Sequence, residues 1–225
     1  MSDSSLINLT DVCKKYGLTV VLRNVNLRVE EGDFISIRGK SGAGKTTLLK
    51  IMGLMETPDS GEVNIFGRLV GELSDKEASD IRLRKIGFVF QFFNLIPSLT
   101  VLENIELPLA LAGVSGRKRK EKALEFLRYF GLMNLANRFP GTLSGGERQR
   151  VAVIRALINN PKVILADEPT SSLDDENSNL LISLLSGVNR ERRVAIILTT
   201  TDLYEKLPTN KDYLLRDGGL YLLPL

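Results

Sequence analysis

The stretch GKSGAGKT, Gly39 to Thr46, decides the fold of this chain. It fits the pattern G-x-x-x-x-G-K-[ST], in which glycines let the backbone curl so that its N–H groups face an anion. It also stands between the alternating strand pattern of VNLRVEEGDFISIRG and the helical pattern of LLKIMGLM. The alternative is a plain glycine turn before a helix. We expect a phosphate-binding loop, because the N-terminus of a helix attracts negative charge.

Individual residues of this loop have expected tasks. Lys45 reaches the β- and γ-phosphates of a nucleotide, and the hydroxyl of Thr46 binds Mg²⁺. The helix that follows buries one face, formed by Leu48, Ile51, Met52 and Met55. The predicted nucleotide-binding residues of the loop are Gly39, Ser41, Gly42, Gly44, Lys45, Thr46 and Thr47.

The remaining patterns predict an α/β fold with a parallel sheet, because apolar strand runs alternate with helices. The expected strands are LINLTDVCKKY, GEVNIFG, IGFVF, KVILADEP and RRVAIILT, and the expected helices include DKEASDIRLRK and NSNLLISLLSGVNR. Residues 100–159 are mainly helical, with breaks expected at Pro108, Gly113 and Pro140–Gly141. DYLLRDGGLYLLP predicts a hairpin that turns at Asp217–Gly218–Gly219.

The composition excludes several classes of protein. The chain of 225 residues is 43% hydrophobic and 25% charged, which is typical of a globular domain, and its net charge of +3 gives no argument for nucleic acid. Cys13 is the single cysteine, which favours a reducing compartment. No apolar stretch is long enough to span a bilayer, and the first ten residues do not resemble a signal peptide. The basic run RKRK, residues 117–120, predicts a solvated helix face or, alternatively, a polar or membrane-adjacent contact.

Two adjacent carboxylates, Asp167 and Glu168, follow the apolar run VILA. Burying them bare would be costly, so they need a cation or a proton-transfer task. Asp167 suits a nucleotide-bound Mg²⁺, directly or through a water, and Glu168 then polarises the attacking water. The alternative is a strand end that happens to be acidic.

The stretch LSGGERQR, residues 143–150, predicts a second anion-binding helix start. Ser144 and Glu147 fit a capping box, which alone would explain them. Gly145 and Gly146 would each cost about 1 kcal/mol in the first helical turn relative to alanine, so their presence suggests that something approaches the backbone. A head-to-tail pair of chains could sandwich a nucleotide between one phosphate loop and the partner's Ser144–Gly146, although spacing alone does not decide this.

GKSGAGKTT, LSGGERQR, VILADEPTSSLD and Gln91 in FVFQFF, in this order, resemble the ATP-binding subunit of ATP-binding cassette (ABC) transporters. PDSGEVNIFG and IGFVFQFFNLIPSLTVLENIELPLALAG resemble more narrowly the lipoprotein-releasing and macrolide-export (LolD/MacB) class. The resemblance implies a RecA-like P-loop NTPase core with a mostly parallel sheet, an antiparallel β-subdomain and a helical subdomain. It implies one nucleotide-binding domain over 1–225, with the core and β-subdomain in about 1–91 and 161–225 and the helical subdomain in about 92–160.

The resemblance also implies roles for three residues that spacing alone leaves open. Tyr16 matches the aromatic side chain that stacks on adenine, although a plain strand tyrosine is the alternative. Gln91 matches the glutamine that senses Mg²⁺ and the attacking water, whereas its position alone suggests an ordinary strand end. Asp174 matches an aspartate that acts across the dimer, and its alternative role is a helix N-cap.

The family places a histidine before the aspartate of TTTD, residues 199–202, but this chain contains no histidine at all. Thr201 stands at that position, where the histidine would contact the γ-phosphate. Threonine can donate a hydrogen bond but is short and uncharged, so contact with the phosphate would need a bridging water. Turnover is therefore expected to be slower, while the motifs for ATP binding and dimerisation are intact.

The resemblance implies an ATPase subunit that needs ATP and Mg²⁺ and forms a homodimer with ATP. It also implies that the subunit drives an integral-membrane permease from the cytoplasmic face of the membrane and binds no nucleic acid. Expected catalytic residues are Glu168, Lys45, Gln91 and Thr201, and expected metal ligands are Thr46, Gln91 and Asp167. The alternative function is a slow or inactive ATPase that acts as an ATP-switched clamp or scaffold on a membrane protein. A DNA-repair or chromosome ATPase would carry a long coiled-coil insertion, which the sequence lacks.

Overall fold

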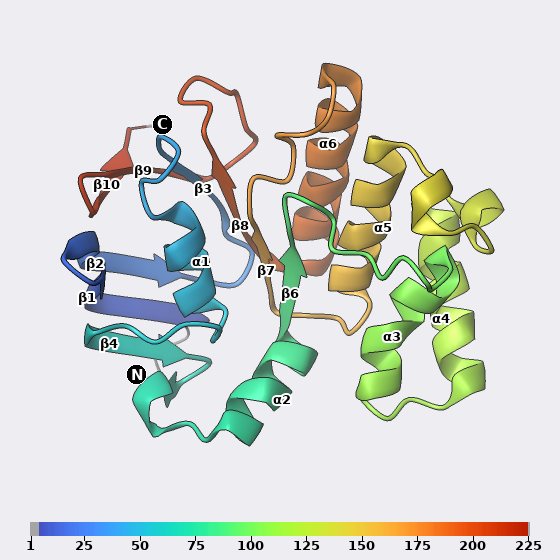
Figure 1. Cartoon of the computed structure of the whole chain (residues 1–225), viewed down its shortest axis with the longest axis horizontal. Helices are drawn as coiled ribbons and strands as arrows, with labels where there is room; N and C mark the ends of the chain where they lie inside the picture. Colours follow the sequence, from blue (N-terminus) through green and yellow to red (C-terminus); the bar gives the residue numbers. More distant parts are fainter. Residues whose placement is uncertain (1–4, 225) are drawn as a thin grey trace.

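The strands form two sheets in the computed structural model, which describes residues 5–224 (Figure 1). The smaller sheet contains β1 (Ile7–Tyr16), β2 (Thr19–Val29), β4 (Ser60–Ile65) and β5 (Arg68–Leu69), in the order β2-β1-β4-β5. The central sheet contains β3 (Phe34–Arg38), β6 (Ile86–Val89), β7 (Val163–Ala166), β8 (Ala195–Thr200), β9 (Lys211–Arg216) and β10 (Gly219–Leu223), in the order β10-β9-β3-β8-β7-β6. The helices are α1 (Lys45–Met52), α2 (Asp75–Lys85), α3 (Val101–Leu111), α4 (Gly116–Tyr129), α5 (Gly145–Leu157) and α6 (Asp175–Arg192).

The pairing of these strands confirms the predicted α/β fold. All neighbours from β9 to β6 in the central sheet run parallel, and the hairpin β9–β10 adds one antiparallel edge strand. In this hairpin Arg216 pairs with Gly219, so the predicted turn falls on Asp217 and Gly218. The smaller sheet is antiparallel throughout, as the resemblance implied.

Alternate side chains of the central strands enter two different cores, which explains why these strands read as continuous apolar runs. One core joins the central sheet to α1 and the smaller sheet, and it receives Val163, Leu165, Ala195 and Ile197. The other core joins the sheet to α3, α4, α5 and α6, and it receives Ile164, Ala166, Ile196 and Leu198. Figure 1 shows these two layers on opposite sides of the strands β3, β8, β7 and β6. The carboxyl ends of the strands are thereby held between them.

Two details of the helices differ from the prediction. Helix α1 ends at Met52, because Gly53 caps it and Leu54 turns into the left-handed region at a φ of 58°. Met55 therefore lies beyond the helix and is 44% exposed instead of buried. Pro108 does not break its helix but lies within α3, three residues before the end, where its own carbonyl still accepts a hydrogen bond from Ala112 N at 3.0 Å.

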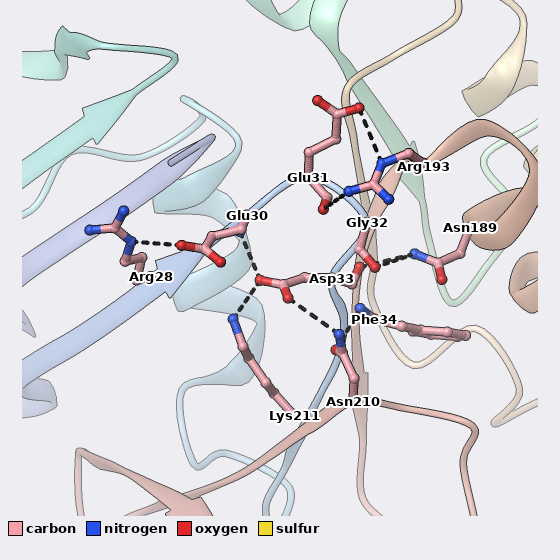
Figure 2. A network of polar contacts seen from close by, with 10 residues as sticks. All are labelled: Arg28, Glu30, Glu31, Gly32, Asp33, Phe34, Asn189, Arg193, Asn210 and Lys211. Atoms are coloured by element: carbon pink, nitrogen blue, oxygen red, sulfur yellow. Dashed lines mark hydrogen bonds and ion pairs between the residues drawn. The ribbon is translucent and has the colours of Figure 1, made fainter. Parts of the chain in front are cut away.

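A polar network fixes the start of β3 and therefore the strand that leads into the phosphate loop (Figure 2). The carboxylate of Asp33 accepts hydrogen bonds from Glu30 N and Lys211 Nζ, each at 2.7 Å. Asn189 on α6 donates to the carbonyls of Gly32 and Asp33 at 3.0 and 3.2 Å. Asp33 thus joins the turn before β3 to the start of β9 and to α6.

The basic run at residues 117–120 opens α4 and lies largely on the surface, which agrees with both a solvated helix face and a polar or membrane-adjacent contact. Arg117 pairs with Glu121 one turn later at 2.9 Å. Between residues 5 and 224, none of the helices combines the length and the apolar character that crossing a bilayer requires. Residues 1–4 of the expected non-signal N-terminus lie outside the described part.

Candidate active site

The phosphate loop ends at Gly44, which serves as the N-cap of α1 with a φ of 103°. A Cβ atom at this position would lie 2.8 Å from Cγ1 of Val21, so both the backbone angle and the space require glycine. No side chain caps the start of α1. Its first N–H groups are consequently available to an anion, as the sequence predicts.

Lys45 directs its ammonium group back over this loop. The Nζ atom donates hydrogen bonds to the carbonyls of Gly39 at 2.7 Å and Lys40 at 3.1 Å. It also lies 3.2 Å from Oε1 of Glu168, with side-chain exposures of 4% for the lysine and 18% for the glutamate. The positive charge is therefore held at the loop by oxygen atoms on two sides.

Asp167 connects the start of α1 with the ends of β7 and β8. Its Oδ2 atom accepts a hydrogen bond of 2.8 Å from the Thr46 hydroxyl, and its Oδ1 atom accepts one of 2.8 Å from the Thr199 hydroxyl. The Thr199 oxygen in turn accepts a bond of 3.0 Å from Glu168 N. Since β7 and β8 are neighbouring parallel strands, their carboxyl ends bring these groups together.

Glu168 holds its side chain toward the phosphate loop through an unusual backbone conformation. Its φ of 45° lies in the left-handed region, which non-glycine residues seldom occupy and which concentrates at functional sites. Asp167 still follows the strand pattern, since its N–H donates to Val89 O at 2.8 Å. The chain therefore turns sharply between the two carboxylates, so that Asp167 faces Thr46 and Glu168 faces Lys45.

The three threonines after Leu198 have separate surroundings. Thr199 contacts Asp167, as described, whereas the Thr200 hydroxyl donates to Oε2 of Glu205 at 3.0 Å and accepts from Asp202 N at 3.1 Å. The carbonyl of Thr200 accepts a bond of 3.2 Å from Gly39 N and so joins β8 to the phosphate loop. Thr201 follows the strand and is exposed.

Three further predicted residues, Tyr16, Gln91 and Ser144, lie outside this hydrogen-bonded cluster. Tyr16 is 48% exposed and donates to Oε2 of Glu56 at 3.2 Å. Gln91 follows β6, and its carbonyl accepts a bond of 3.3 Å from the Ser172 hydroxyl. Ser144 caps α5 together with Glu147, which confirms the predicted capping box.

The glycines at the start of α5 have different neighbours. A Cβ atom at Gly146 would lie 2.1 Å from Oδ1 of Asn177, so the close approach expected there is made at least in part by this chain itself. At Gly145 the nearest atoms would lie 3.8 Å away, which leaves that backbone open. Asp174 caps α6 by accepting from Asn177 N at 2.8 Å, and this hydrogen bond holds the pKa of the Asp174 carboxyl below its ordinary value.

The sequence interpretation missed a buried ion pair behind the loop. Arg38 is 4% exposed, and its Nη2 atom lies 3.2 Å from Oδ2 of Asp212 while its Nη1 donates to Asp202 O at 3.2 Å. Burial alone would raise the pKa of Asp212, but hydrogen bonds from Ser36 and Thr209 and the charge of Arg38 hold it below its ordinary value. An arginine at the end of the apolar strand FISIR was the available signal.

Comparisons with known proteins show the family of the chain. A family model described as ABC transporter matches residues 22–171. The chain is similar to the lipoprotein-releasing system ATP-binding protein LolD of Bacteroides thetaiotaomicron, with 46% identity over 88% of this chain and 90% of the relative. LolD of Bacteroides fragilis is 44% identical over 96% of this chain and 100% of the relative.

A solved structure has the same fold over almost its whole length. The dimeric structure of a post-hydrolysis state of the ATP-binding cassette MJ0796, bound to ADP and Pi, has a TM-score of 0.88 and 42% identity. The match covers 97% of this chain and 99% of that one. The RecA-like architecture implied by the resemblance is therefore confirmed. Because the family model and these relatives match most of its length, the chain belongs to the ABC transporter family, as an ATP-binding protein of that family.

Proposed function

We propose that this chain binds and hydrolyses ATP as the ATP-binding subunit of a membrane transporter of the lipoprotein-releasing type. The observation that carries the proposal is that four of the predicted residues converge at one end of the central sheet. Thr46 contacts Asp167 at 2.8 Å, and Lys45 contacts Glu168 at 3.2 Å. The named relatives are ATP-binding proteins of lipoprotein-releasing systems, which supports this transporter class.

The side chains have distinct tasks in this proposal. Lys45 binds the β- and γ-phosphates, together with the free N–H groups at the start of α1. Glu168 orients the attacking water and accepts its proton, for which its carboxylate must leave Lys45. Gln91 and Thr201 complete the site on the γ-phosphate side, and Tyr16 stacks on the adenine.

The oxygen atoms around Asp167 fit a magnesium ion that is shared with the nucleotide. Within residues 5–224 no group of three acidic, cysteine or histidine side chains forms a cage for a metal. Thr46 and Asp167 instead offer a hydroxyl and a carboxylate, and Mg²⁺ is characteristically bound by one or two such oxygens plus substrate phosphates. When bound, the ion neutralises charge on the phosphates, and Gln91 is its third proposed protein partner.

The active form is a head-to-tail homodimer in which Ser144, Gly145 and Gly146 of one chain close on the nucleotide of the other. Helices α1 and α5 pack in different cores on opposite faces of the central sheet, which supports two separate anion-binding helix starts in one chain. The structural neighbour is itself a dimer bound to ADP and Pi, which supports this arrangement.

A permease contact follows from the proposed transporter class. We assign the core and β-subdomain to about residues 1–91 and 161–225 and the helical subdomain, which contacts the permease, to about residues 92–160. The chain would then act at the cytoplasmic face of the membrane, held there by its partner. A second candidate function is a slow ATPase that serves as an ATP-switched clamp, which the exposed Thr201 at the expected histidine position favours.

The dimer can be tested with Glu168→Gln, which removes the proposed base but leaves the phosphate loop intact. This variant should elute as a dimer on size-exclusion chromatography with MgATP and as a monomer with MgADP, because two ATP molecules join one dimer. Equal elution with both nucleotides contradicts the trans arrangement. Separate measurement of ATP turnover by the native chain decides between the transporter motor and the clamp.

A further inference from the structure

We infer that Thr199 is a positioning residue that sets both carboxylates of the active site, Asp167 through its side chain and Glu168 through its backbone. This inference rests on the proposed function. Thr199 touches neither nucleotide nor water in this assignment, and acts through its two neighbours.

The position of Thr199 in β8 directs its side chain to the phosphate-loop side of the sheet. Ala195 and Ile197, at the same parity, enter the core that contains α1, whereas Ile196 and Leu198 enter the opposite core. Successive side chains of a strand point to opposite faces, so Thr199 continues the row on the α1 side. A side chain in this row normally packs against apolar neighbours. The hydroxyl of Thr199 instead contacts Asp167, directly after the end of β7.

The donor and the acceptor are fixed in both hydrogen bonds of the Thr199 hydroxyl. Glu168 N can only donate, so the threonine oxygen accepts from it at 3.0 Å. The single hydroxyl proton is consequently free for Oδ1 of Asp167, at 2.8 Å. Thr199 is 0% exposed, so no solvent water competes for either bond. The hydroxyl therefore has one orientation, which it imposes on both neighbours.

Fixing Oδ1 determines what the other oxygen of Asp167 can do. Oδ2 accepts the Thr46 hydroxyl proton at 2.8 Å, which leaves the Thr46 oxygen lone pairs to face the nucleotide metal. If the carboxylate rotated, this alignment would be lost. Thr199 thereby holds the pair of oxygens that fits the metal, without being a ligand itself, in the way that outer hydrogen bonds orient metal ligands elsewhere.

The second bond acts on Glu168, whose φ of 45° places it in the strained left-handed region. Such a conformation persists only when its surroundings hold it. The bond from Glu168 N to Thr199 is one of these restraints, and it sets the point from which the glutamate side chain leaves the backbone. Removing the hydroxyl should therefore affect the metal and the base together.

The test compares Thr199→Val, which keeps the shape but removes the hydroxyl, with Thr199→Ser, which keeps the hydroxyl. The probe is the non-hydrolysable analogue AMP-PNP, with equilibrium affinity measured in EDTA and in Mg²⁺. We expect the gain in affinity on adding Mg²⁺ to be about tenfold smaller in Thr199→Val, with kcat for ATP reduced by at least as much, because a hydrogen bond to a charged group is lost. Affinity in EDTA should not fall, and Thr199→Ser should restore both quantities.

Ser36→Ala is the matched control, since Ser36 is also 0% exposed on a central strand and donates to a carboxylate, Asp212, at 2.5 Å. It should lower thermal stability without changing the Mg²⁺-dependent gain. A native gain in Thr199→Val, or an equal loss in EDTA, overturns the inference while the proposed function stands. If the native chain shows no binding of AMP-PNP or no gain with Mg²⁺, the proposed function fails and this inference falls with it.

Discussion

The Nζ atom of Lys45 lies 3.2 Å from Oε1 of Glu168, across the junction of α1 and the end of β7. Both side chains are largely buried, so each charge depends on the other for compensation. An incoming phosphate must compete with the carboxylate for the lysine. In the proposed mechanism, binding of the nucleotide phosphate to Lys45 therefore releases the carboxylate of Glu168.

Glu168→Gln should bind ATP more tightly than the native chain, because the neutral amide competes less well for Lys45. We expect about a tenfold lower Kd in EDTA, where neither protein hydrolyses ATP, by the difference between charged and neutral hydrogen bonds. Titration calorimetry measures it. Glu176→Gln, on the exposed first turn of α6, is the control and should leave the Kd unchanged. Equal affinities for the native chain and Glu168→Gln would contradict the competition.

Lys45→Ala and Ser144→Arg should separate binding within one chain from binding across the dimer. Lys45→Ala removes the ammonium that the loop holds, so the monomer should lose measurable ATP affinity. Ser144→Arg places a bulky side chain at the start of α5, on the other side of the sheet from α1, so monomer affinity should persist while the dimer is lost. ATP titration and size-exclusion chromatography measure the two effects. If both variants lose ATP binding equally, Ser144 acts within its own chain.

Thr201→His should speed ATP turnover if Thr201 occupies the γ-phosphate sensor position. An imidazole in direct contact would stabilise the transition state by about 1–2 kcal/mol relative to a hydroxyl that acts through water. That corresponds to roughly a tenfold gain in kcat. The gain should disappear when Glu168 is also replaced by glutamine, since the two residues act together. An unchanged or lower kcat in the single variant means that the loop has adapted to threonine.

The capping box of α2 should make stability depend on pH through Glu77. Hydrogen bonds from Ser74, followed by Arg68, lower the pKa of Glu77 from 4.5 to about 2. A lowered pKa in the folded state stabilises it above the ordinary value, and this contribution is lost as the pH falls from 4.5 toward 2. Glu77→Gln should therefore be less stable than the native chain at pH 6, with the difference shrinking in acid.

Urea unfolding from pH 6 to pH 3 measures this difference. Glu72→Gln, on the exposed turn before α2, is the control and should follow the native chain across the range. A difference for Glu77→Gln that stays constant down to pH 3 would show that the carboxylate charge does not stabilise the cap.

Much of this architecture can be predicted from the pattern of residues that are close in sequence. The glycine positions of the phosphate loop, the apolar run before Asp167 and the box of Ser144 and Glu147 each depend on residues close in sequence. Helix α1 and the P-loop follow from them directly. The errors are also local: Pro108 stays in the last turn of its helix, and Met55 lies beyond the left-handed Leu54.

The contacts that the sequence did not reveal depend on strand order and register. Arg38 meets Asp212 because β3 and β9 are neighbours, although the two residues are 174 positions apart in sequence. Thr199 meets Asp167 because β7 and β8 pair in parallel and place the two ends level. Neither pairing can be read from alternation alone, since a pattern of buried positions does not identify its partner.

The most direct test of the central claim is the rate of phosphate release from MgATP by the purified native chain, measured as a function of protein concentration. Two chains complete each active site in this account, so the rate per chain should rise with concentration until the dimer is saturated. It should also stay above that of Glu168→Gln throughout. A rate no greater than that of Glu168→Gln at any concentration would contradict hydrolysis at this site, and a rate per chain independent of concentration in the monomeric range would contradict the composite dimer site.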